Sequence, residues 1–211
     1  MPPRPLLSVF PLLTATALAT MAIVTCGGDG DGANCEAGDA SEARPLTTND
    51  QWSEISADED LFWTGAPEHA RCGEEAIRVE DVDGDLWFDV TTEGCNYLTV
   101  SQSSLGCAAA GEDLTIWVFH YAITEGAGPY RMALTLGDPP EVVWEIEKAV
   151  PTVAGLVFEP VRLQRPIAIG EAITWHISNH GVNTWSLIGV FAGPPGSIVP
   201  GSRAPSPDQS P

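Results

Sequence analysis

Short apolar runs recur along the middle of the chain and are separated by Gly, Pro, Asn and Asp. Within most runs apolar and polar residues alternate, which is the pattern of strands with one buried face. Turn residues follow at intervals of about 8–12 residues, as is typical of an all-β sandwich. We expect a single antiparallel β-sandwich of jelly-roll type with strands at 76–82, 85–92, 96–101, 113–123, 129–136, 141–147, 153–158, 171–178 and 183–191.

Four of the runs carry more specific expectations. The run at 141–150 follows two prolines and has apolar residues at helical spacing, so a short helix is an alternative to the strand there. The run at 113–123 is apolar on both faces, which predicts a central strand. In the run at 171–178, His176 alternates with apolar neighbours and should point away from the core. In the last strand, Trp185, Leu187 and Phe191 should fill one face.

Asp83-Gly84 lies between two of the expected strands and favours a two-residue type I′ hairpin turn. That turn places Ile77 opposite Val90, and the same register places further apolar residues opposite each other on that face.

The other face of this hairpin is polar apart from one tryptophan. The register sets Arg78 against Asp89 and Glu80 against Trp87. An exposed tryptophan can stack on the apolar C–H face of a sugar ring, so Trp87, Glu80 and Asp89 are the candidate ligand-binding residues. The alternative is that Trp87 is buried under a second sheet or a loop, because large aromatic residues usually occur in cores.

The same register predicts a disulfide bond. Extended beyond the strands, it places Cys72 opposite Cys95, where Cα atoms lie about 4.5–5.5 Å apart. A disulfide needs roughly 4.4–6.8 Å between Cα atoms. Cys35 and Cys107 then remain to pair with each other, and the competing pairing is Cys95 with Cys107.

The N-terminus predicts export. Residues 1–25 have a short positive start and an uncharged apolar run, as in a signal peptide. An uncleaved membrane helix is the alternative. The residues before Cys26 resemble a bacterial lipobox, which implies that Cys26 carries lipid. Because Gly27, and not Asp, follows that cysteine, the resemblance implies an outer-membrane lipoprotein.

Composition divides the rest of the chain. Residues 26–50 are rich in Gly and Asp and are expected to be a tether, whereas residues 193–211 are proline-rich and expected to be disordered. The sandwich should therefore occupy residues 51–192. With 9 Lys+Arg against 29 Asp+Glu, the net charge of −20 excludes nucleic acid as a partner, because too few cations contact phosphates.

Two groups of residues suggest a divalent metal. His120, His176 and His180 could gather at one site, since imidazole is a common metal ligand. A scatter of unrelated histidines is the alternative, because no metal-ligand spacing is present. Asp81, Asp83 and Asp85 resemble the start of a calcium loop, but the glycine and the twelfth residue do not fit, so we interpret them as a solvated hairpin tip.

Two segments resemble a group of myxobacterial lipoproteins: Cys-Asn-Tyr-Leu-Thr at 95–99 and Asn-His-Gly-Val-Asn-Thr-Trp at 179–185. A Gly-Glu-Asp before a strand, at 111–113, and a strand that ends at His120 are similar as well. The resemblance covers roughly residues 70–190. It implies a lipoprotein and a β-sandwich, and it brings no activity with it.

Together these features favour a lipid-anchored protein of the cell envelope. We expect it to bind a glycan or another envelope ligand and not to be an enzyme. The alternatives are a metal-binding protein or metal-dependent enzyme that uses His120, His176 and His180, and a structural envelope component without a ligand.

Overall fold

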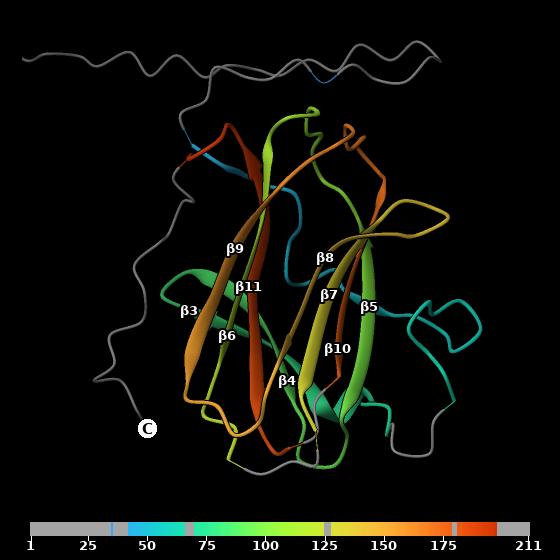
Figure 1. Cartoon of the computed structure of the whole chain (residues 1–211), viewed down its shortest axis with the longest axis vertical. Coiled ribbons are helices and arrows are strands. Elements are labelled where there is room, and N and C mark those ends of the chain that lie inside the picture. The colour runs from blue at the N-terminus through green and yellow to red at the C-terminus, as the bar shows by residue number, and fades with distance from the viewer. Residues whose placement is uncertain (1–34, 36–41, 66–69, 125–127, 179–180, 198–211) are drawn as a thin grey trace, which may run out of the picture.

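The computed structural model describes residues 35, 42–65, 70–124, 128–178 and 181–197. They form two antiparallel sheets that pack face to face as a β-sandwich of jelly-roll type, which confirms the predicted fold class (Figure 1). The first sheet contains β1 (Arg44–Pro45), β3 (Ile77–Val82), β4 (Asp85–Thr91), β6 (Asp113–His120), β9 (Gly155–Arg162) and β11 (Thr184–Gly193). The second contains β2 (Ser53–Glu54), β5 (Tyr97–Ser103), β7 (Tyr130–Leu136), β8 (Glu141–Lys148) and β10 (Ala172–Ser178).

Strand order explains how distant segments meet. The first sheet runs β3-β4-β11-β6-β9, with β1 also paired to β11, and the second runs β2-β5-β10-β7-β8. All nine predicted strands are present, and the helical alternative at 141–150 is wrong because that run forms β8. A single turn of 3-10 helix at Glu74–Ala76 is the helical element among the described residues.

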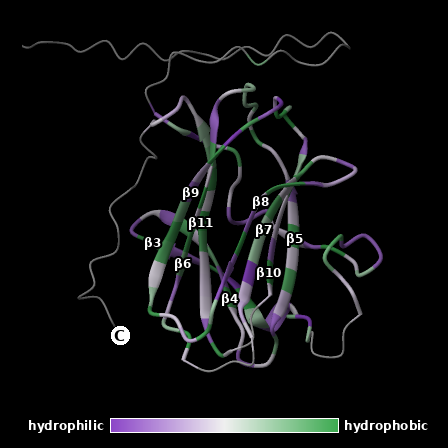
Figure 2. Cartoon of the chain, in the orientation of Figure 1, coloured by the Kyte–Doolittle hydropathy of each residue, from purple (hydrophilic) through white to green (hydrophobic). Residues whose placement is uncertain are grey.

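The core lies between the two sheets. Trp185 of the first sheet and Trp175 of the second are fully buried there, together with aliphatic residues from both layers. In Figure 2 green, hydrophobic segments alternate with white and purple ones along the long strands, whereas the turn between β7 and β8 is largely hydrophilic. Burial of one face of each strand is the source of the alternating pattern in the sequence.

The hairpin of β3 and β4 has the predicted turn and register. Asp83 and Gly84 both have positive φ, 57° and 93°, as a type I′ turn requires. Ile77 pairs with Val90. Beyond the strands, Cys72 and Cys95 form a disulfide with their Cα atoms 5.0 Å apart, which confirms the predicted pairing.

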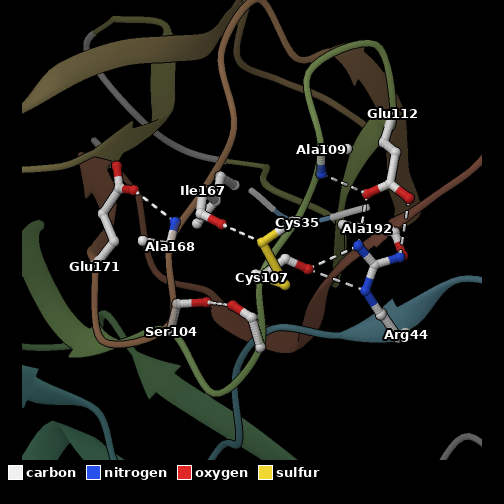
Figure 3. Close-up of a disulfide and its surroundings, with 11 residues drawn as sticks. Cys35, Arg44, Ser104, Cys107, Ala109, Glu112, Ile167, Ala168, Glu171 and Ala192 are labelled. Atoms are coloured by element: carbon white, nitrogen blue, oxygen red, sulfur yellow. Dashed lines mark hydrogen bonds and ion pairs between the residues drawn. A yellow bond between two sulfur atoms is a disulfide. The ribbon is translucent and has the colours of Figure 1, made fainter. Parts of the chain in front are cut away.

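The sandwich begins earlier than residue 51, so the predicted tether of residues 26–50 is too long. Leu46 is fully buried in the core, and its N–H donates to the Val190 carbonyl at 2.8 Å. Cys35 is bonded to Cys107, the second predicted disulfide, with 6.0 Å between Cα atoms (Figure 3). The overall composition of this acidic, glycine-rich stretch does not reveal the few residues that pack against the sandwich.

A β-bulge in β11 changes which face its residues occupy. The pairing with β6 shifts between Leu187 and Gly189. Trp185 and Leu187 therefore lie in the core, whereas Phe191 packs in a separate cluster with Trp117. The prediction that Phe191 shares a face with Trp185 is wrong, because the extra residue of a bulge reverses the alternation after it.

Several predictions fall outside the described residues. These are the signal peptide at 1–25, the lipidation site Cys26, His180, and the tail from residue 198. In the ranges that the structure does describe, no helix has the length and apolar character needed to cross a membrane.

Candidate functional site

The outer face of the first sheet carries large side chains that the core does not use. In β6, Ile116 and Val118 belong to the core. The alternation of a strand therefore turns Trp117 and Phe119 to the outside. The same alternation in the β3–β4 hairpin turns its polar residues to this outer face.

Strand register places one outward residue from each of five strands in a single row. Asp89 of β4 pairs with Arg78 of β3 on one side and with Ser186 of β11 on the other. Ser186 in turn pairs with Phe119 of β6, and Phe119 with Leu156 of β9. With about 4.8 Å between neighbouring strands, this cross-sheet row spans roughly 19 Å. Its β3–β4 end is charged, and its β6–β9 end is apolar.

The apolar end of the row is an aromatic surface. Trp117 pairs directly with Phe158, and the two rings meet edge to face with 5.8 Å between centroids. Phe119 meets Tyr121 in the same geometry at 5.1 Å. Trp117 is only 3% exposed, whereas Phe158 is 44% and Tyr121 48% exposed. The buried Trp117 thus supports the exposed Phe158 ring, and Phe119 supports the exposed Tyr121 ring.

The charged end is a small network around Arg78. Its Nε lies 2.9 Å from Glu80 Oε1 and 3.8 Å from Asp89 Oδ2. Glu80 pairs across the hairpin with Trp87, and both side chains are half-buried. The aromatic ring, the two carboxylates and the guanidinium therefore occupy one small area of the outer face.

Asp89 is unusual for a carboxylate on an outer face. It is 4% exposed, and its Oδ1 has no hydrogen-bond partner among the described residues. Burial raises the pKa of Asp89 above its ordinary value; the hydrogen bond from Ser186 acts in the opposite direction, and the Glu80 charge adds to the rise. A buried acceptor without a donor is costly, so the charge of Asp89 is poorly compensated beneath this face.

The predicted trio of Trp87, Glu80 and Asp89 therefore does lie together. Trp87 is half-buried and is not covered as fully as the buried alternative required. The aromatic end was not predicted, because two apolar faces in the run at 113–123 indicate a central strand and do not distinguish a core face from an outer one. The available signal was Leu156 and Phe158, two residues apart in the neighbouring strand β9.

His120 lies inside the sandwich. Its ring packs against those of Trp185 and Tyr130, with centroid distances of 4.9 and 5.7 Å. Its Nδ1 is 2.8 Å from the Tyr121 carbonyl oxygen. Burial lowers the pKa of His120, which favours the neutral imidazole.

His176 lies on the outer face of the second sheet, away from the core, as predicted. It is nevertheless buried, because the segment that contains Phe62, shortly before Cys72, crosses over it. The Phe62 ring stacks on the His176 ring at 4.2 Å, and Thr99 Oγ1 lies 2.9 Å from Nδ1. The same covering segment is held by the Tyr97 hydroxyl, which donates to Asp60 Oδ2 at 2.8 Å.

The fold does not bring His120 and His176 together into the proposed metal site. His120 faces the interior and His176 the far side of the second sheet, so that sheet separates them and they cannot share an ion. Among the described residues no three His, Cys, Asp or Glu side chains gather to hold a metal. At the hairpin tip, Asp81 Oδ1 accepts the Gly84 N–H at 2.8 Å and so stabilises the turn.

Comparison with known proteins adds distant structural likenesses. No family model and no curated protein matches the chain. TmCBM61 in complex with beta-1,4-galactotriose is similar over 71% of this chain and 97% of its own, with 11% identity and a TM-score of 0.43. The K3 adhesin domain of Lys-gingipain from Porphyromonas gingivalis is similar over 67% and 91%, with 13% identity and a TM-score of 0.42. A CBM4 structure is similar over 57% and 92%, with 14% identity and a TM-score of 0.35. Likenesses this distant carry no inference about ligand or activity.

Proposed function

We propose that this protein is a lipid-anchored, non-catalytic glycan-binding module of the cell envelope, and that it binds sugar on the outer face of the first sheet. The observation that carries the proposal is the cross-sheet row with its neighbours: Glu80 lies beside its charged end, and the exposed rings of Phe158 and Tyr121 lie beside its apolar end. A sugar ring needs both kinds of partner, since it has an apolar C–H face and a rim of hydroxyl groups.

The length of the row favours a chain of sugars over a single one. Five strands contribute to it, and Phe158 and Trp87 flank it at opposite ends. An extended glycan laid across the strands would contact the rings at β6 and β9 and, at the other end, Trp87 on β4 and the Glu80 carboxylate on β3. Small contributions from several such contacts add up on an open surface, where no single pocket has to enclose the ligand.

Binding without catalysis fits the state of the two carboxylates. Glycoside hydrolysis uses one carboxyl group as a proton donor and a second on the other side of the scissile bond. Here Glu80 is held in an ion pair with Arg78, and Asp89 is buried in the sheet surface. We therefore propose that a bound polysaccharide is recovered uncleaved.

The anchoring part of the proposal rests on the N-terminal sequence. Two disulfide bonds support export, because such bonds persist in oxidising compartments. Lipid on Cys26 would hold the sandwich at the outer membrane through a short tether that ends at Cys35. If Cys26→Ser leaves the protein in the membrane fraction, or if native Cys26 carries no lipid, the anchor is wrong.

The binding part is tested by affinity electrophoresis against a panel of soluble polysaccharides. Trp87→Ala and Phe158→Ala should each weaken binding about tenfold or more, as loss of an aromatic anchor does. Val142→Ala is the matched control, since Val142 on β8 is as exposed as Phe158, at 42% against 44%, but belongs to the other sheet. Unchanged binding in both aromatic variants would contradict the proposal, and absence of binding to any glycan would favour a structural role.

A further inference from the structure

We infer that the charged end of the cross-sheet row selects uncharged glycans and that polyanionic glycans are excluded. This inference rests on the proposed glycan-binding function and names the class of glycan that the face takes. It follows from the buried charge of Asp89, from where the cations are held, and from the charge of the whole chain.

Asp89 sets the chemistry of the group that binds beside it. As a carboxylate it has acceptor oxygens only, and Oδ1 has no donor from the described part of the chain. Oδ1 is also buried, so a ligand does not contact it but lies in the field of its charge. A uronic acid or sulfated sugar bound above Asp89 carries a like charge and is repelled, whereas an uncharged sugar is not.

The arginines on this face do not offset that repulsion. Arg78 is held by Glu80 at 2.9 Å, and Arg162, at the far edge on β9, is held by Asp113 at 2.7 Å. Binding an anionic sugar through either one would require breaking an existing ion pair. A net charge of −20 adds a long-range field that lowers the local concentration of polyanions.

The aromatic end has the complementary property, because it needs no charge. Phe158 and Tyr121 are the exposed rings there, and stacking on them depends on the apolar face of a sugar. Binding of an uncharged glycan should therefore change little between low and high salt, whereas exclusion of a polyanion should weaken as salt screens the charges.

The test compares two polysaccharides with one backbone: a soluble neutral glucan that the full mature chain binds, and its carboxymethylated derivative. Titration calorimetry at low and at moderate salt gives both affinities. The wild type should bind the neutral polymer at least about tenfold more tightly at low salt. Asp89→Asn keeps the shape of the side chain but adds a donor and removes the charge, and it should reduce that preference to about threefold or less.

Asp85→Asn is the matched control, since it makes the same change in net charge on the same face, outside the row and without releasing an arginine from its ion pair. It should keep the preference of the wild type. Equal or tighter binding of the carboxymethylated polymer by the wild type would overturn the inference while leaving the proposed function intact. An equal loss of preference in both variants would also overturn it, because general charge would then be the cause. If neither polymer nor any other glycan binds, the proposed function itself fails.

Discussion

Arg44 and Glu112 form a two-pronged ion pair at the end of the sandwich where Cys35 is bonded to Cys107 (Figure 3). Nη2 lies 2.6 Å from Oε2 and Nη1 3.1 Å from Oε1. The same guanidinium donates to the Cys107 carbonyl from both Nε and Nη2, at 3.0 and 2.7 Å. One side chain thus fixes the first strand of the domain, the loop of the second disulfide and a buried carboxylate.

Loss of Arg44 should therefore lower the free energy of unfolding strongly. The Glu112 side chain is only 3% exposed, so Arg44→Met would leave a buried carboxylate without its cation. We expect a fall of about 3–5 kcal/mol in the free energy of unfolding, measured by urea denaturation. Arg162→Met is the control, because its ion pair with Asp113 is more exposed, and it should cost about 1 kcal/mol or less. Equal losses in the two variants would contradict this account of Arg44.

Each disulfide should contribute to stability by closing a loop in the unfolded chain. The bonds span 23 residues for Cys72–Cys95 and 72 residues for Cys35–Cys107. Replacing either pair with serine should lower the free energy of unfolding by about 2–4 kcal/mol. Peptide mapping without reduction should recover linked peptides for these two pairs. A peptide that links Cys95 to Cys107 would show that the hairpin register does not hold at its open end.

The buried Asp89 should leave a signature in the dependence of stability on pH. Because its pKa is raised in the folded state, the folded chain holds this proton more tightly than the unfolded chain does. The free energy of unfolding therefore falls as pH rises from the ordinary aspartate pKa of about 3.9 through the raised value. Asp89→Asn removes the titrating carboxyl group and, with it, the cost of a buried charge at neutral pH. The variant should therefore be more stabilising, relative to wild type, near pH 7 than near pH 4.

Thermal unfolding at the two pH values measures this difference. Val79→Ala, which removes no titratable group from the same hairpin, is the control and should change the stability by the same amount at both pH values. If the effect of Asp89→Asn is equally independent of pH, burial does not govern the Asp89 carboxyl.

The sequence predicted the fold well where local chemistry determines geometry. Asp83-Gly84 is enough to set a type I′ turn, the turn sets the register, and the register brings Cys72 to Cys95. The same reasoning placed Trp87 on the polar face. These are short-range consequences of turn type and alternation, so they need no knowledge of the other sheet.

Features that depend on distant segments were not predictable in this way. The bulge after Leu187 moves Phe191 to the outer face. Gly189 lies at the register shift, and a glycine inside a strand can mark a bulge, but alternation alone carries Phe191 to the same face as Trp185. His176 is covered by Phe62, which lies more than a hundred residues earlier in the chain. The cross-sheet row needs the strand order of the whole first sheet, which alternation alone does not supply.

The tryptophan indole resonances give the most direct test that glycan binds on the outer face of the first sheet. The chain has seven tryptophans, each with one indole N–H signal in a nitrogen–proton correlation spectrum. Trp87 and Trp117 lie on that face, Trp175 and Trp185 in the core, and Trp63 on the far face of the second sheet. Titration with a polysaccharide that binds should shift the signals of Trp87 and Trp117 and leave those of Trp175, Trp185 and Trp63 in place. A shift of Trp63 with no change at Trp87 would contradict the account.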